Sequence, residues 1–266
     1  MSTAIVFIVI GLAAFLIAGL TFFSGFGLGT LLMPVFALFF DLPTAIAATA
    51  VVHLANNLFK AGLVRREADW AVALRFGLPA ALAAVVGAWL LALASGLAPL
   101  LSYELWGREA VVTPIKSLVG FLILVFAVIE VHPRFDKLAF ARKWLPLGGV
   151  ISGFFGGLSG HQGALRGAFL IKSGLSKGSF VATSALCAVV VDLSRLMVYG
   201  AGFYSRHLDL IASGSEALQI AFGCLSAFIG TFLGRRFLSK VTMKTVQGVV
   251  GSMLILIALL LLAGLL

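Results

Sequence analysis

The stretch SGHQGALRG, residues 159–167, lies between two strongly apolar segments. It brings a histidine, a glutamine, an arginine and three glycines into a part of the chain that otherwise has the composition of a membrane span. Irregular backbone at membrane depth is tolerated only where it is buried in protein or lines a water-filled cavity. The stretch therefore predicts a break in a membrane helix rather than a continuous crossing.

The composition of the whole chain points to a lipid environment. Of its 266 residues, 61% are hydrophobic and 11% are charged, whereas an average soluble domain carries roughly 25% charged residues. The N-terminal segment is apolar but has no basic region of the kind that begins a signal peptide, so we expect it to be retained. These observations predict a multi-pass protein of the inner (plasma) membrane, whose surroundings are the lipid bilayer.

The charge and the cysteines exclude several other classes. The formal net charge is +9, but no basic run has the length or the interleaved aromatic residues of a nucleic-acid site. Basic cytoplasmic loops account for such a charge in a membrane protein. Cys187 and Cys224 lie inside apolar segments, which is typical of small core residues. We therefore expect no nucleic-acid partner, no metal and no other cofactor, while the sequence is compatible with an oligomer.

The apolar segments differ in length. A spanning helix needs about 20 apolar residues, and most segments fit one crossing. Residues 5–40 are too long for one and are interrupted at 24–27, while residues 144–172 are interrupted at 156–163. The segments fall at residues 5–40, 44–64, 72–97, 113–131, 144–172, 178–200, 213–234 and 243–266.

The basic loops decide how these segments cross the membrane. Lysines and arginines gather in residues 60–75, 132–143 and 235–244, and the positive-inside rule places all three loops in the cytoplasm. All three loops can lie in the cytoplasm only if residues 144–172 enter the membrane and return on the same side. By the same count, residues 5–40 form a hairpin that begins and ends outside. We expect residues 95–113 to be an interfacial segment on the outer side.

The two interrupted segments resemble each other, which indicates an internal repeat. Each copy holds a hairpin and three further helices, an odd number of crossings, so the copies are expected to be inverted relative to each other. Inverted repeats with broken helices are typical of secondary transporters. The sequence thus predicts an all-α membrane protein with a first repeat at 1–131, a cytoplasmic linker at 132–143 and a second repeat at 144–266. The matching runs are Phe22-Phe23-Ser24-Gly25 with Phe154-Phe155-Gly156-Gly157, and Ala48-Thr49-Ala50 with Ala182-Thr183-Ser184.

The polar residues at the two breaks are candidates for binding an anion. The free N–H groups at the start of a half-helix favour an anion, and the fork of Arg166 suits an oxyanion. The alternatives are that the glycines only allow close helix packing and that Arg166 extends to the cytoplasmic surface. We expect hydrogen-bond donors to the substrate from Ser24, Gly25, Ser159, Gly160, His161 and Gln162.

A second group of polar residues lies on the segment 178–200. Asp192 and Arg195 are three residues apart, which places them on one face of a helix, and Thr183 lies further along that face. Either the pair only fixes helix packing, or Asp192 orients Arg195 or carries a proton. We expect Arg195 and Thr183 to contact the substrate.

A third group lies on the corresponding helix of the first copy. His53, Asn57 and Lys60 share a stripe at spacings of four and three residues, with Asn56 beside it. Intramembrane polar residues normally face a cavity or a partner. We expect Asn57 to contact the substrate and His53 to couple a proton or orient other groups. A packing role is the alternative for His53, and a topology role is the alternative for Lys60.

Three runs of residues carry a likeness to a known family. The chain resembles the TauE/SafE sulfite exporter family, also called the toluene sulfonate uptake permease family, over nearly its whole length. The first motif departs from the commonest form because it lacks three adjacent glycines. The runs are Phe23-Ser24-Gly25-Phe26-Gly27-Leu28-Gly29 with Pro34, Gly157-Leu158-Ser159-Gly160-His161-Gln162-Gly163-Ala164-Leu165-Arg166, and Phe180-Val181-Ala182-Thr183-Ser184 with Asp192-Leu193-Ser194-Arg195-Leu196 and Tyr199.

The resemblance implies a function that agrees with the polar residues. It implies transport of small sulfur-containing anions such as sulfite, sulfoacetate or other organosulfonates, which we expect to be exported by alternating access. An anion channel, or an importer of thiosulfate or small carboxylates on the same scaffold, is the alternative. No spacing typical of a hydrolase or metalloprotease appears, so we expect a transporter and not an enzyme.

Overall fold

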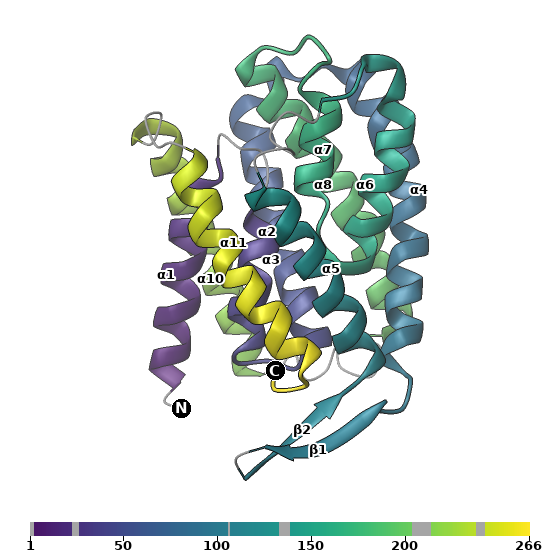
Figure 1. The fold of residues 1–266 in the computed structure, drawn as a ribbon. Helices are drawn as coiled ribbons and strands as arrows, with labels where there is room; N and C mark the ends of the chain where they lie inside the picture. Colours follow the sequence, from purple (N-terminus) through teal and green to yellow (C-terminus); the bar gives the residue numbers. More distant parts are fainter. Residues whose placement is uncertain (1–2, 23–26, 106, 133–138, 204–213, 238–242) are drawn as a thin grey trace.

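A computed structural model describes residues 3–22, 27–105, 107–132, 139–203, 214–237 and 243–266 (Figure 1). These residues form an all-α membrane protein with one small β hairpin. The helices are α1 (Thr3–Leu20), α2 (Leu28–Ala37), α3 (Leu42–Val64), α4 (Trp70–Ser95), α5 (Pro114–Val131), α6 (Leu145–Ser159), α7 (Gly163–Leu170), α8 (Lys177–Val198), α10 (Ser215–Phe237) and α11 (Met243–Leu262). The strands are β1 (Leu101–Leu105) and β2 (Arg108–Val112), and short helical turns lie at Arg65–Glu67, Arg142–Trp144 and Tyr199–Phe203.

The long helices have the length and surface of membrane spans. Large apolar side chains face outward, including Leu82 (74% exposed) and Leu78 (61% exposed) on α4, and such a surface requires lipid around it. The expectation of an all-α membrane protein is confirmed. Five described stretches are long and apolar enough to cross a bilayer, namely Thr3–Leu20, Leu42–Glu67, Trp70–Ser95, Lys177–Ala201 and Glu216–Arg236.

Both helix breaks expected from the sequence are present. Gly27 stands before α2 with φ +108°, and Gly160 follows α6 with φ +82°, a left-handed conformation that glycine adopts without steric cost. The helices that follow have 10 residues (α2) and 8 residues (α7). At 1.5 Å per residue these helices are about 15 Å and 12 Å long, at most half of a hydrocarbon core of about 30 Å. The return arms of the two hairpins are therefore half-length helices.

The basic connections lie together at one end of the bundle. Arg142 Nη2 is 3.8 Å from Asp69 Oδ2, which joins the α5–α6 connection to the start of α4. Arg235 Nη1 donates to the Leu63 carbonyl at 3.4 Å, which joins the end of α10 to the end of α3. The three basic connections therefore meet at one end, as the charge count requires, and the positive-inside rule predicts that this end faces the cytoplasm.

The other end carries the β hairpin and the C-terminus. Tyr103 Oη donates to the Ala263 carbonyl at 2.6 Å, and Val111 N donates to the Gly264 carbonyl at 3.1 Å. The N-terminus lies at the same end, below α1 (Figure 1). The segment expected to lie at the membrane interface is thus a β hairpin, whose strands pair antiparallel from Leu101 with Val112 to Leu105 with Arg108.

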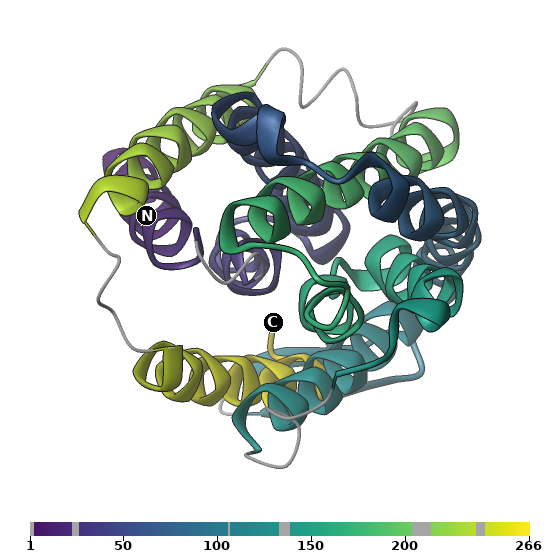
Figure 2. The same cartoon turned by 90° about the horizontal axis from the view of Figure 1, so that it is seen from above.

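Two helix pairs are packed so closely that only glycine fits between them. A Cβ on Gly153 of α6 would overlap the Ala80 carbonyl of α4, and a Cβ on Gly157 would overlap the Ala84 carbonyl. On α10, a Cβ on Gly230 would overlap the Phe15 carbonyl of α1. Small residues allow such close approach, which strengthens van der Waals packing between helices in lipid. In the view from above, α1 and α10 lie side by side at the rim, across the bundle from α4 (Figure 2).

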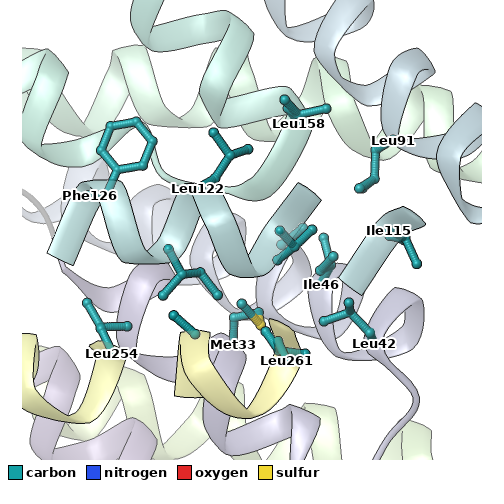
Figure 3. Close-up of a cluster of buried hydrophobic side chains, with 14 of the residues drawn as sticks. Met33, Leu42, Ile46, Leu91, Ile115, Leu122, Phe126, Leu158, Leu254 and Leu261 are labelled. Atoms are coloured by element: carbon teal, nitrogen blue, oxygen red, sulfur yellow. The ribbon is translucent and has the colours of Figure 1, made fainter. Parts of the chain in front are cut away.

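An apolar cluster buries the broken hairpins from one side. It contains residues of α2, α3, α4, α5, α6 and α11, and α2, the return arm of the first hairpin, is buried in protein along nearly its whole length (Figure 3). Irregular backbone at membrane depth needs this kind of enclosure. Its labelled members are Met33, Leu42, Ile46, Leu91, Ile115, Leu122, Phe126, Leu158, Leu254 and Leu261.

Candidate functional site

The buried carboxylate of Asp192 on α8 is the centre of a polar network. Its Oδ2 is 2.6 Å from His53 Nδ1 of α3, and its Oδ1 is 2.9 Å from Arg195 Nη2. Gln162 Nε2, at the start of α7, donates to Oδ1 at 3.1 Å. The carboxylate and the Arg195 side chain are both fully buried. The expected Asp192–Arg195 pair therefore forms, and it is joined by groups from α3 and from the α6–α7 break.

Arg166 belongs to the same network. It is 1% exposed, its Nη1 donates to Gln162 Oε1 at 2.9 Å, and its Nε donates to Ser184 Oγ at 2.8 Å. The alternative that this arginine extends to the cytoplasmic surface is therefore wrong. The backbone of Gln162 is itself held, because Ser152 Oγ donates to its carbonyl at 2.8 Å. Gln162 thus couples Arg166 to Asp192 through its two side-chain ends.

The beginning of α2 contacts the break between α6 and α7. A Cβ on Gly29, in the first turn of α2, would lie 3.4 Å from His53 Cδ2 and 3.6 Å from the Gly160 carbonyl. A Cβ on Gly160 would lie 2.9 Å from Arg195 Nη1. The first N–H groups of a helix have no partner within it, and they carry a partial positive charge. The start of α2 thus lies beside His53 and the Gly160 carbonyl, and Gly160 itself lies beside the buried Arg195 guanidinium.

The buried charges of the described residues do not balance. Lys60, Arg166 and Arg195 are at most 5% exposed, and Asp192 is the buried carboxylate of the described part of the chain. An isolated buried charge is costly unless a partner of opposite sign compensates it. Among the described residues, three buried basic side chains therefore stand against one buried carboxylate.

The family of the chain follows from a comparison with protein-family models. The model described as "Sulfite exporter TauE/SafE" matches residues 7–261. The chain belongs to the TauE/SafE sulfite exporter family. It is accordingly a membrane transporter of sulfur anions such as sulfite. Searches of curated proteins and of solved structures each gave no match.

Lys60 is a part of this TauE/SafE protein that the sequence did not clearly assign. It is buried on α3, and its Nζ lies 5.8 Å from the centre of the Phe22 ring. Phe22 packs with Val64, Val181 and Ala182 in a small apolar cluster. The sequence indicated Lys60 only through its spacing of seven residues from His53, which places both on one face of the helix. Ser152 carried no comparable signal, because small hydroxyl residues are common in membrane helices, and Ser184 stood out only as a member of the repeat and family runs.

The structure separates one of the expected residues, Thr183, from the centre of the network. Thr183 Oγ1 accepts a hydrogen bond from the backbone N–H of Asp69 at 3.0 Å, so its hydroxyl fastens the start of α4. Asn57 lies at the edge of the network, because its Nδ2 donates to the His53 carbonyl at 2.8 Å and is 3.2 Å from His53 Nδ1. Ser24 and Gly25 lie outside the described residues.

His161 and Ser159 form a pair of their own within the α6–α7 break of this TauE/SafE family member. His161 Nδ1 lies 3.0 Å from Ser159 Oγ and 3.1 Å from the Ser159 carbonyl. The imidazole ring stacks on Phe126 of α5, with ring centres 5.4 Å apart. His161 is thus adjacent in sequence to Gln162 of the polar network but is held by different contacts.

Proposed function

We propose that this chain exports sulfite or a small organosulfonate by alternating access, and that the anion binds where the start of α2, the α6–α7 break and Arg195 meet. The observation that carries the proposal is the buried Arg195 guanidinium beside Gly160, within a set of buried side chains whose positive charges outnumber the one buried carboxylate of the described residues. The family supports a sulfur anion. The geometry independently supports an anion, because two helix starts and a guanidinium provide hydrogen-bond donors and positive charge.

The membrane potential is sufficient to drive this export. A cell with a negative interior expels an anion with about 2.3 kcal/mol for each charge per 100 mV. An exporter therefore needs no obligatory coupled ion, although a coupled proton changes how transport responds to pH.

The proposed roles follow from the contacts. Arg195 contacts the anion, while Asp192 orients Arg195 and competes with the anion for its guanidinium. His53 and Asp192 share a proton across their 2.6 Å contact, and neutralising the carboxylate frees Arg195 for the substrate. Arg166 is a positioning residue that acts through Gln162.

Alternating access needs two units that move against each other, and we propose that these are the two inverted repeats, 1–131 and 144–266. The helix pairing supports this division. Gly230 joins α10 of the second half to α1 of the first, and Gly153 joins α6 of the second half to α4 of the first. The first helix of each half therefore packs against the fourth helix of the other, as a two-fold relation between inverted repeats requires.

Uptake of labelled sulfite into proteoliposomes tests the proposal. We expect Arg195→Gln to lower the initial rate by on the order of 100-fold, since it removes a charge-assisted contact worth up to about 3 kcal/mol. Arg195→Lys keeps the charge and is expected to retain part of the rate. Arg142→Gln is the matched control, because its side chain is 50% exposed and pairs with Asp69 at the surface.

Two outcomes would contradict the assignment. Full activity of a folded Arg195→Gln variant would show that the anion binds elsewhere. Equal transport of acetate and sulfite by the wild type would contradict a site built for sulfur anions. Elution as a single monodisperse species in detergent establishes that each variant is folded before its rate is compared.

A further inference from the structure

The contacts of His161 determine which of its ring nitrogens carries the proton. Ser159 Oγ donates its hydrogen to the Phe155 carbonyl at 3.2 Å, so it presents only lone pairs to His161. The other neighbour of His161 Nδ1 is the Ser159 carbonyl, which is also an acceptor. Two acceptors around one nitrogen require that this nitrogen bear the hydrogen. Nδ1 of His161 is therefore the protonated position of the neutral ring.

The opposite nitrogen is consequently a free acceptor. His161 is 3% exposed, and its Nε2 is buried without a hydrogen-bond partner in the described part of the chain. In a neutral imidazole with hydrogen on Nδ1, Nε2 carries a lone pair and accepts a hydrogen bond. Buried polar atoms are almost always paired in native proteins. An orphaned acceptor at this depth indicates a ligand that arrives with a hydrogen to donate.

The position of this acceptor connects it to the proposed anion site. His161 follows Gly160, where an added Cβ would lie 2.9 Å from Arg195 Nη1 and whose carbonyl would lie 3.6 Å from a Cβ on Gly29 of α2. It precedes Gln162, which donates to Asp192. The stacking on Phe126 and the contacts to Ser159 hold the ring from two sides. The break thus holds one fixed, unpaired acceptor next in sequence to Gln162, which donates to the polar network.

We infer that His161 is a specificity-determining residue that accepts a hydrogen bond from the substrate, so that the protein prefers a singly protonated sulfur oxyanion, hydrogensulfite, over anions without an O–H group. The inference rests on the proposed function and narrows its substrate class. It also corrects the expectation that His161 donates to the substrate. In the bound state, the O–H of hydrogensulfite donates to Nε2, while its negatively charged oxygens accept from Arg195 and from the helix N–H groups.

Equilibrium binding of two matched monoanions tests the inference. Methanesulfonate has the charge and approximate size of hydrogensulfite but carries a methyl group in place of the O–H. We expect the wild type to bind hydrogensulfite on the order of 100-fold more tightly, because a site built to pair a substrate hydroxyl rejects an analogue that lacks it. In His161→Phe, the preference is expected to fall to about twofold or less, with methanesulfonate binding nearly unchanged.

A second variant and a pH series separate this role from a packing role. His161→Gln keeps an acceptor oxygen and is expected to restore part of the preference, which a purely structural role does not predict. Wild-type binding of sulfite is expected to weaken as rising pH removes the substrate proton, whereas methanesulfonate binding stays constant over the same range.

The failures of the two proposals are distinguishable. The role of His161 would be overturned if His161→Phe weakened the binding of both anions equally, or if it kept the preference for hydrogensulfite. Either result would leave the Arg195 site intact. Both proposals are supported if Arg195→Gln loses binding of both anions and His161→Phe loses binding of hydrogensulfite alone.

Discussion

The α4–α6 interface and the α3–α8 crossing lie in the same bundle and are built in opposite ways. Along α4–α6, Gly153 and Gly157 bring backbone against backbone at Ala80 and Ala84, with no room for another atom. At α3–α8, charged side chains meet around Asp192, and their positive charge exceeds their negative charge among the described residues. The first interface is complete without a ligand, whereas the second would be balanced by the anion that we propose to bind there. The comparison separates the scaffold of the protein from its site.

The largest expected effect comes from filling the α4–α6 interface. Gly153→Leu places a side chain where the Ala80 carbonyl already lies, and the helices must separate to admit it. Overpacking costs typically 1–3 kcal/mol and occasionally more, and here the obstacle is backbone that has no rotamer to change. We expect the variant to aggregate or to lose most of its thermal stability in detergent. A melting temperature equal to that of the wild type would show that α4 and α6 are not locked.

The next effect comes from removing one charge of the α3–α8 network. Asp192→Asn leaves Arg195 buried without its partner, and breaking a buried pair costs about 3–5 kcal/mol. We expect a clear fall in the melting temperature and loss of sulfite transport.

The corresponding double variant sharpens this prediction. Asp192→Asn with Arg195→Gln removes both charges, so its melting temperature is expected to recover part of the loss while transport stays absent. A double variant as unstable as the sum of the two single variants would contradict direct coupling between these side chains.

A smaller effect is expected at Lys60, between the network and the cytoplasmic end. Lys60→Met keeps the length of the side chain and removes the charge that lies over the Phe22 ring. We expect the Michaelis constant for sulfite on the cytoplasmic side to rise about three- to tenfold, since a nearby charge concentrates the anion. The maximal rate is expected to change little. A fall in the maximal rate with an unchanged Michaelis constant would instead indicate a role in the conformational change.

The smallest effect is expected at a glycine that, unlike Gly153, has space for a side chain. Gly62 lies on α3, and nothing is within 4 Å of the position of an added Cβ. Gly62→Ala is expected to stabilise the helix by about 0.5–1 kcal/mol, with sulfite transport unchanged. A destabilised Gly62→Ala variant would indicate that this face of α3 has a close neighbour.

The sequence predicted the breaks well because their causes are local. Glycine and polar residues interrupt the apolar runs at 24–27 and 156–163, so both breaks were visible without a structure. The second is confined to residues 160–162, because α6 continues to Ser159. The spacing of three residues also placed Asp192 and Arg195 on one face, and the structure confirms their contact.

Other features depend on which helix each face meets, and periodicity does not specify this. The spacing places Thr183 on the same face of α8 as Asp192. Thr183 lies further along the helix, however, and its hydroxyl accepts a hydrogen bond from the backbone N–H of Asp69 rather than joining the network. The depth of Lys60 depends on the packing of Phe22. The β hairpin at residues 101–112 forms where strand pairing and the C-terminus meet. The proton position on His161 follows from hydrogen bonds that only the folded break creates.

The most direct test of the central claim is the position of a bound anion in an experimental structure. Selenite has the shape and charge of sulfite, and its heavier central atom is easier to detect. The account predicts a selenium peak within contact of Arg195, Gly160 and the first turn of α2. That peak is expected to disappear in Arg195→Gln. A peak elsewhere in the bundle, or one that persists in this variant, would contradict the proposed site.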